Sequence, residues 1–289
     1  MQPDTTYRSD HSFHRWTLDD IAFDRIEPER VSDDPVLFQL LTSSSFVEID
    51  TPLYAHSLAE FCHDDQPFAD WVLHSWQPEE VRHGEALRRY VTTAWPEYDW
   101  ERAYRSFHEA YLPLCNDEVL QPTLSLEMIS RCVVEVGTST YYGMIDSYAR
   151  EPVLKSLASH IRADEVHHYQ RFLETFHAHR DEEGSGRLGV MKAMLERFRM
   201  IRDTDAVVAY RYVLEGLPPA HPFRDFRMEQ LEPHYAAMAR EHYPFGMATL
   251  MLLKPLHLAA PLKKPLVPLI AATGRWYVSH ASLQGLAHE

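Results

Sequence analysis

The sequence feature that most constrains this chain is a pair of Glu-x-x-His motifs that lie far apart. Glu80 and His83 form one motif, and Glu165 and His168 form the other. Residues three apart share one face of a helix, so each motif places a carboxylate beside an imidazole. Helical bundles that hold two metal ions use two such motifs and one glutamate from each of two further helices. The sequence therefore predicts an all-α fold built around a two-metal site.

Helical periodicity runs through most of the chain. We expect a helix over about 35–61 with a kink at Pro52, and a second over about 67–93. A shorter helix over 97–115 would connect this pair to two long helices over about 124–148 and 153–179. Two more are expected over about 188–216 and 222–242, followed by an irregular or short-helical, proline-rich tail. No strand-like alternation of any length interrupts this pattern.

Four Glu-x-x-His matches occur, and helix geometry separates them. With 18 histidines in the chain, roughly one or two matches would arise by chance. Groups that meet in an antiparallel helix pair must lie equally far from the turn. Glu80 and Glu48 lie roughly 15 and 17 residues from a turn near Asp65, a similar depth on the helix rise. Glu60, of the match Glu60/His63, lies only about five residues from that turn and misses this level.

The second pair of helices repeats this arrangement. Glu135 and Glu165 lie roughly 15 and 14 residues from a turn near Glu151, again level on the helix rise. Glu174, of the match Glu174/His177, is nine residues past Glu165 and turns to the opposite face. Four carboxylates and two imidazoles survive as candidate metal ligands: Glu48, Glu80, His83, Glu135, Glu165 and His168.

The charge of this set indicates a cation. Four carboxylates at one level within apolar stripes repel one another unless cations neutralise them. One alternative is that these side chains are scattered over the surface. The other is buried ion pairs, Arg131 with Glu135 and Arg162 with Glu165, although the other two glutamates have no basic neighbour at helical spacing. Oxygen and imidazole ligands suit iron or manganese better than zinc.

The residues around the motifs resemble a known family. Trp76-Gln77-Pro78-Glu79-Glu80-Val81-Arg82-His83-Gly84 is similar to the second-helix signature Trp-x-x-Glu-Glu-x-Arg-His-Gly of the soluble acyl-carrier-protein desaturases. Asp164-Glu165-Val166-His167-His168 resembles their fourth-helix signature Asp-Glu-x-x-His. Glu48 precedes Tyr54 by six residues and Thr138 follows Glu135 by three, as in that family. The resemblance covers about residues 35–180 and implies a ferritin-like four-helix bundle with a di-iron centre.

The resemblance implies a role for each ligand. Glu80 and Glu135 would bridge the two ions, and Glu48 and Glu165 would each bind one ion as terminal ligands. Each imidazole, His83 and His168, would bind one iron. Manganese in place of one or both irons is a further possibility for the same ligand set.

The resemblance also implies supporting residues. Asp164 would accept a hydrogen bond from a ligand imidazole, and Trp76 would join it in an electron route. Thr138 would supply a proton during the reaction. Equally, the Thr138 hydroxyl would only bond a backbone carbonyl of its own helix. Related N-oxygenases have an additional histidine ligand, and His167 would take that role here. Adjacent helix residues point about 100° apart, however, which favours a polar or surface role for His167.

The implied activity is that of an O2-dependent oxidoreductase. It would remove hydrogen from an unactivated C–H bond of an acyl chain, carrier-bound or free, with electrons from an external ferredoxin-like donor. A hydroxylase or N-oxygenase of a small specialised metabolite is the second reading. Iron storage is the third, against which the extra C-terminal helices argue. A structural helical protein without metal is the last. We expect a homodimer.

Composition limits the partners and the compartment. The 28 basic against 43 acidic side chains give a net charge of −15, which argues against nucleic acid and fits an acidic carrier protein poorly. Three cysteines without a CxxC motif favour a reduced, cytoplasmic setting. The polar N-terminus predicts no signal peptide.

The chain is predicted to divide into three segments of one domain. These are an N-terminal arm over 1–34, the bundle over 35–183, and additional helices with an apolar tail over 184–289. Lysines and prolines interrupt the apolar tail, so we expect no transmembrane helix. Its segment 250–270 would contact a membrane, cap a lipid-like substrate, pack over the bundle or form a dimer interface.

Overall fold

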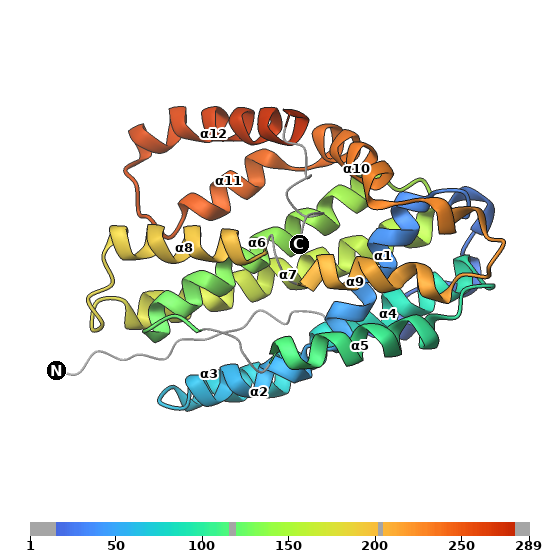
Figure 1. Cartoon of the computed structure of the whole chain (residues 1–289). Coiled ribbons are helices and arrows are strands. Elements are labelled where there is room, and N and C mark those ends of the chain that lie inside the picture. The colour runs from blue at the N-terminus through green and yellow to red at the C-terminus, as the bar shows by residue number, and fades with distance from the viewer. Residues whose placement is uncertain (1–15, 116–119, 202–204, 281–289) are drawn as a thin grey trace.

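The computed structural model describes residues 16–115, 120–201 and 205–280. Within these ranges the fold is all-helical and contains no strand, which confirms the predicted all-α class. Four helices carry the candidate site: α1 (Pro35–Ile49), α4 (Gln77–Ala94), α6 (Leu124–Tyr148) and α7 (Pro152–His179). The others pack around them (Figure 1): α2 (Pro52–Phe61), α3 (Gln66–Trp71), α5 (Trp100–Cys115), α8 (Arg187–Ile201), α9 (Asp205–Val213), α10 (Met228–His242), α11 (Phe245–Leu253) and α12 (Ala260–His280).

The four site helices form two antiparallel pairs. α1 packs against α4 and α6 against α7, and α4 also contacts α7 (Figure 1). In the first pair, Phe38 near the start of α1 meets Trp95 just past the end of α4, with ring centroids 5.2 Å apart. In the second pair, the Cys132 thiol on α6 faces the Tyr169 carbonyl on α7 at 3.8 Å. Matching depths in each pair therefore meet, as the sequence predicted for the buried glutamates.

Side-chain caps fix the starts of three of these helices. Asp34 accepts hydrogen bonds from two backbone N–H groups of α1, both at 3.0 Å, and Pro35 occupies the first turn, where no N–H is needed. Thr123 caps α6 by accepting the Leu126 N–H. Glu151 caps α7 and also accepts a hydrogen bond from the Tyr90 hydroxyl at 2.9 Å. These caps fix where the helices that carry the candidate site begin.

The first predicted helix is two helices. α1 ends at Ile49 and α2 begins at Pro52, so the expectation of one kinked helix over 35–61 is wrong at Asp50 and Thr51. Pro52 has no N–H to donate to the Glu48 carbonyl, and Thr51 N–H donates to it instead at 3.3 Å. The buried Asp50 carboxylate accepts hydrogen bonds from α5, which hold the break in place.

The second predicted helix is continuous but changes its winding before the site. α3 passes into a π-helical turn, η4 (Val72–Trp76), and then into α4. Pro78 lacks the N–H that would bond the His74 carbonyl, so the regular ladder is interrupted at this point. Such wide turns are frequent near functional sites, and this one lies one turn before the ligand motif.

The N-terminal arm is ordered and packs on the core. Three 3₁₀ turns follow one another: η1 (Leu18–Asp20), η2 (Phe23–Arg25) and η3 (Pro28–Arg30). Apolar residues of the arm, among them Trp16 and Val31, are buried in the same core cluster as Phe38 of α1 and Leu231 of α10. Residues 1–15 of the arm lie outside the described residues.

The C-terminal region differs most from expectation. The predicted helix over 188–216 corresponds to α8, α9 and η5 (Leu214–Gly216), with 202–204 outside the described residues. The short turn η6 (Pro222–Asp225) precedes α10. The tail, expected to be irregular or short-helical, contains the short helix α11 and then α12, which is 21 residues long and has Pro265 and Pro268 inside it. Both prolines lie on an exposed stretch of α12, where water can bond the freed carbonyls. Among the described residues, none of the helices combines the length and the apolar character that crossing a membrane requires.

Candidate metal centre

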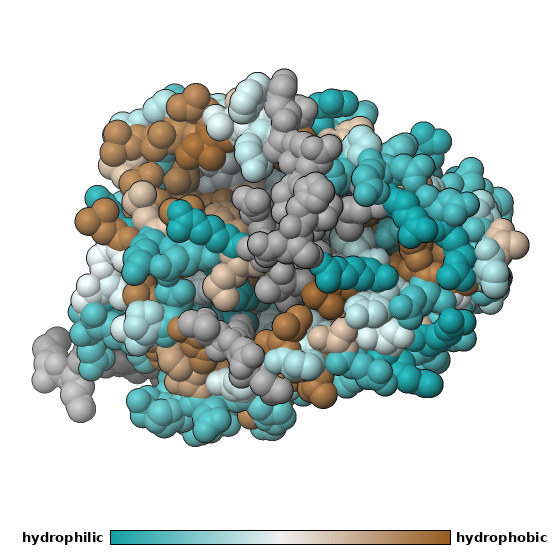
Figure 2. Space-filling model, in the orientation of Figure 1, coloured by the Kyte–Doolittle hydropathy of each residue, from teal (hydrophilic) through white to brown (hydrophobic). Residues whose placement is uncertain are grey.

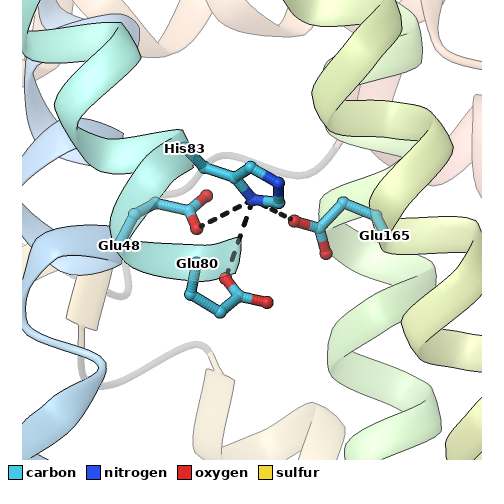
Figure 3. Close-up of side chains that lie close together, drawn as sticks. All are labelled: Glu48, Glu80, His83 and Glu165. Carbon is cyan, nitrogen blue, oxygen red and sulfur yellow. Dashed lines mark ion pairs between the residues drawn. The ribbon is translucent and has the colours of Figure 1, made fainter. Parts of the chain in front are cut away.

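Six buried side chains from α1, α4, α6 and α7 converge between the two helix pairs. They form two overlapping groups, and within each group one potential ligand atom per residue lies within 4.8 Å of the others. Figure 3 shows the first group around one imidazole. The groups are Glu48, Glu80, His83 and Glu165, and Glu80, Glu135, Glu165 and His168. All six residues selected from the sequence are thus brought together.

The two groups share Glu80 and Glu165. This differs from the roles implied by the resemblance, in which Glu80 and Glu135 bridge and Glu165 is terminal. The reason is positional: Glu80 on α4 and Glu165 on α7 come from the two helices that also carry the imidazoles and that touch each other across the pairs. Glu48 and Glu135, from the outer partner helices, each belong to one group.

Each imidazole turns its Nδ1 atom toward three carboxylates. His83 Nδ1 lies 3.2 Å from Glu165 Oε1, 3.7 Å from Glu48 Oε2 and 4.0 Å from Glu80 Oε2 (Figure 3). His168 Nδ1 lies 3.0 Å from Glu80 Oε1, 3.7 Å from Glu135 Oε2 and 4.0 Å from Glu165 Oε2. The two halves of the cluster therefore repeat the same arrangement of one nitrogen and three oxygens.

Several polar atoms of the cluster are buried without a well-formed hydrogen bond. These are Nδ1 of His83, Nδ1 of His168, Oε2 of Glu135 and Oε1 of Glu165. Buried polar groups are normally hydrogen-bonded, and leaving them unsatisfied is unfavourable. A cation placed among them would supply the missing partner. The donor set, oxygens with imidazole nitrogen, fits iron or manganese.

The second nitrogen of each imidazole, Nε2, contacts an acidic side chain. For the imidazole on α4 this side chain comes from α7, and for the imidazole on α7 it comes from α4. His83 Nε2 on α4 lies 3.0 Å from Asp164 Oδ2 on α7, as expected for Asp164. His168 Nε2 on α7 lies 2.9 Å from Glu79 Oε2 on α4. This reciprocal arrangement orients both rings so that Nδ1 faces the carboxylates. Glu79 was not selected from the sequence, although Glu79-Glu80 mirrors Asp164-Glu165.

The indole that reaches Asp164 is Trp16, not Trp76. Trp16 Nε1 donates to Asp164 Oδ2 at 2.7 Å, and Arg82 Nη2 donates to the same oxygen at 2.7 Å. The Trp16 ring is parallel to the His83 imidazole, with an interplanar angle of 2° and centroids 6.0 Å apart. Trp76 packs instead against Tyr54 and Phe172. No sequence pattern indicates this contact, because Trp16 lies 148 residues from Asp164.

Two hydroxyl groups touch carboxylate oxygens of the cluster. Thr138 Oγ1 lies 2.5 Å from Glu165 Oε2 and also 3.3 Å from the Glu135 backbone carbonyl. Both expectations for Thr138, a site hydroxyl and a backbone-bonded helix hydroxyl, therefore describe contacts that it makes. The Tyr142 hydroxyl donates to Glu48 Oε1, so Tyr142 belongs to the site and not only to the core.

Local ion pairs do not account for the cluster. Arg131, which lies one turn before Glu135, donates from Nε to Glu127 Oε1 at 2.7 Å. Arg162 Nη2 lies 3.5 Å from the Met247 sulfur. The other Glu-x-x-His matches, Glu60/His63 and Glu174/His177, lie outside both groups, with Glu60 and Glu174 exposed.

His167 is half-buried and also lies outside the two groups. Burial, together with the neighbouring imidazole of His168, lowers the pKa of His167. This agrees with the helix geometry, which turned the residue beside His168 away from the ligand face.

Burial and mutual charge shift the pKa values of the cluster. Burial, followed by the charges of Glu165 and Glu48, raises the pKa of Glu80 well above its ordinary value. Burial and the charge of Glu165 raise the pKa of Glu135 to about 8. Burial opposes ionisation of Glu165 too, but contacts with His83 and the imidazole charges lower its pKa to about 2. Without a cation, the cluster therefore retains protons at neutral pH.

The two imidazoles are stabilised in the protonated form. Burial lowers the pKa of each ring, but the surrounding carboxylates, Asp164 first for His83 and Glu135 first for His168, raise it well above its ordinary value. Burial likewise opposes the charge on Asp164, yet its bonds to His83, Trp16 and Arg82 lower its pKa to about 2. A metal ion would take the place of the protons on the two Nδ1 atoms.

Comparison with known proteins adds no family assignment. No protein-family model matches the chain, and no curated protein matches its sequence.

Proposed function

We propose that the cluster binds two metal ions, iron or manganese, within a ferritin-like bundle formed by α1, α4, α6 and α7. The observation that carries this proposal is the pair of ligand groups that share Glu80 and Glu165. Each group offers carboxylate oxygens and one imidazole nitrogen, and four of these atoms are buried without a hydrogen bond. Two divalent ions would balance the four carboxylates, which otherwise repel each other at this spacing.

We further propose that the chain is an O2-dependent oxidoreductase of the desaturase type. The resemblance in the two ligand motifs supports this activity. Bound iron would supply the redox chemistry that reduces O2. In the net reaction, two hydrogen atoms leave adjacent carbons of an acyl chain; with O2, two electrons from an external donor and two protons, they end as two molecules of water.

The residues of the chain would position and protonate this site. Glu79 and Asp164 hold the imidazole rings in orientation through Nε2. The hydrogen-bonded series from Trp16 through Asp164 to His83 supports a route for electrons into the site. The Thr138 hydroxyl, in contact with Glu165, is the candidate proton donor.

The activity is tested by turnover with a defined substrate. Protein loaded with ferrous iron would be incubated with a chemical reductant, O2 and a saturated acyl chain, either attached to acyl carrier protein or free. We expect an oxygen-dependent product that lacks two hydrogen atoms, and no product with the matched Glu80→Ala variant. A product that gains an oxygen atom would favour a hydroxylase. No oxygen-dependent product, with iron oxidised and retained in large assemblies, would favour iron storage.

A further inference from the structure

The C-terminal helix α12 carries an outward-facing apolar stripe. Leu262, Leu269 and Trp276 recur every seven residues, and 56%, 63% and 61% of their surfaces are exposed. At 100° per residue a seven-residue step nearly repeats the direction, so the three side chains share one face. The exposed Pro265 and Ala272 fall on the same face at intermediate positions. Exposed apolar residues that gather in this way mark an interaction surface.

The opposite face of α12 rests on the protein. α12 packs against α10 and α11. A side chain at Gly274 would lie 3.2 Å from the Phe245 ring of α11, so the helices approach closely there. The half-buried Val267, Ala271 and Val278 lie about 180° from the stripe. The stripe thus points away from the core, and hydrophobic residues gather over α11 and α12 at the upper left of Figure 2.

The charge of this region is opposite to that of the rest of the chain. Residues 242–288 contain no aspartate or glutamate and four lysines or arginines, whereas the whole chain carries −15. Lys264 and Arg275 are exposed at the edge of the outward-facing side of α12, roughly 120–140° around the helix from the stripe, and Lys263 is half-buried roughly 120° away in the other direction. A flat anionic surface would attract α12 and repel the remaining surface, which fixes the orientation of the molecule.

We propose that α12 is an interfacial helix that docks this protein onto an anionic lipid bilayer. Leu262, Leu269 and Trp276 would enter the boundary between headgroups and acyl chains, and Lys264 and Arg275 would contact the anionic headgroups. Trp276 and Tyr277 near the end of the helix are the side chains that membrane–water interfaces favour. The proposal does not depend on the metal site.

The test is vesicle flotation with the full chain. We expect binding to phosphatidylcholine vesicles that contain phosphatidylglycerol, little binding to pure phosphatidylcholine, and weaker binding at high salt. Leu262→Glu/Leu269→Glu should abolish binding. Lys263→Glu/Lys264→Glu should weaken it by about tenfold or more, since each basic residue near an anionic surface contributes to affinity. Leu112→Glu/Leu114→Glu, two exposed leucines on α5, is the matched control and should bind as the native chain does.

Three results would overturn the proposal. One is absence of binding to anionic vesicles. Another is binding that survives Leu262→Glu/Leu269→Glu. The third is a native chain that forms a dimer in solution and does not bind vesicles, together with a Leu262→Glu/Leu269→Glu variant that is a monomer. That result would make the stripe an interface between two copies. Helix content and thermal melting of each variant identify any that has failed to fold, and Leu269→Ser would then replace the double variant.

Discussion

Glu79 on α4 and His168 on α7 lie 2.9 Å apart, Oε2 to Nε2, and Asp164 on α7 holds His83 on α4 in the same way at 3.0 Å. Each ligand imidazole is therefore oriented by the helix that carries the other one. This exchange couples the two helix pairs at the level of the site, so a change in either acidic residue alters the direction of a ligand nitrogen.

We expect Glu79→Gln to weaken metal binding by about 10–100-fold, the usual effect of changing a hydrogen-bond partner that raises the basicity of a ligand imidazole, because the variant loses the carboxylate charge. Folding should be nearly unchanged, because the amide oxygen can still accept from His168. Competition with a chelating dye measures the affinity. Glu174→Gln, an exposed residue on α7, is the control and should bind metal normally. Equal affinity in both variants would show that the charge of Glu79 does not strengthen His168 as a metal ligand.

Gly84 allows α1 and α4 to approach closely beside the cluster. A Cβ at Gly84 would lie 2.6 Å from Ile49 Cγ1 and 2.7 Å from the Ile49 backbone nitrogen. Gly84→Ala should therefore push the helices apart, destabilise the fold by about 1–3 kcal/mol and reduce metal content. Chemical denaturation measures the change. Gly137→Ala is the matched control, because a Cβ there meets nothing within 4 Å, and it should stabilise α6 by about 0.5–1 kcal/mol. A neutral Gly84→Ala would contradict the close approach.

The metal-free protein should lose stability as pH rises from about 5 to above 8. The folded-state pKa of Glu135 is raised to about 8, and those of Glu80, His83 and His168 are raised as well. The folded state thus binds more protons than the unfolded chain over this range, and its advantage disappears as they leave. The lowered pKa values of Asp164 and Glu165 act oppositely: their contribution is lost only as pH falls toward about 2.

Thermal melting at several pH values, with and without added iron or manganese, measures this dependence. Metal should raise the melting temperature more at pH 8 than at pH 5, since ligands release protons when they bind metal. Glu135→Gln should flatten the slope of the metal-free protein. A metal-free protein that becomes more stable from pH 5 to pH 8 would contradict the protonated state described for the cluster.

Trp16→Phe should slow reduction of the loaded site by an external donor while metal content stays unchanged. The variant keeps the packing of the ring but loses the hydrogen bond to Asp164, which is 2.7 Å long. Stopped-flow spectroscopy of the oxidised protein mixed with reductant measures the rate. Trp76→Phe serves as the comparison, since Trp76 contacts Tyr54 and Phe172 instead. If Trp76→Phe slowed reduction and Trp16→Phe did not, the route would run through Trp76.

The helices and the convergence of the six glutamate and histidine side chains could be predicted because they follow local rules. Spacing along each helix and distance from each turn were enough to bring Glu48 to Glu80 and Glu135 to Glu165, and to exclude Glu60 and Glu174. Pro52 alone predicts a kink and not a break at Asp50, because the hydrogen bonds from α5 that hold the break in place come from residues more than fifty positions away.

The remaining differences come from contacts between distant segments. Trp16 reaches Asp164 from the N-terminal arm, and no periodicity within the arm predicts that contact. The sharing of Glu80 and Glu165 depends on how α4 meets α7, which helix spacing within each pair does not fix. The prolines of the α12 segment predict an irregular or short-helical tail, but on an exposed helix water can replace the missing backbone hydrogen bonds.

The central claim is that Glu48, Glu80, His83, Glu135, Glu165 and His168 together bind two metal ions. The most direct test is elemental analysis of the protein purified after expression with ample iron and manganese, beside Glu80→Ala and the control Glu174→Gln. We predict about two ions per native chain and per control chain, and a large loss in Glu80→Ala, because Glu80 belongs to both groups. Near-zero iron and manganese in the folded native protein, or two ions retained by Glu80→Ala, would contradict the claim.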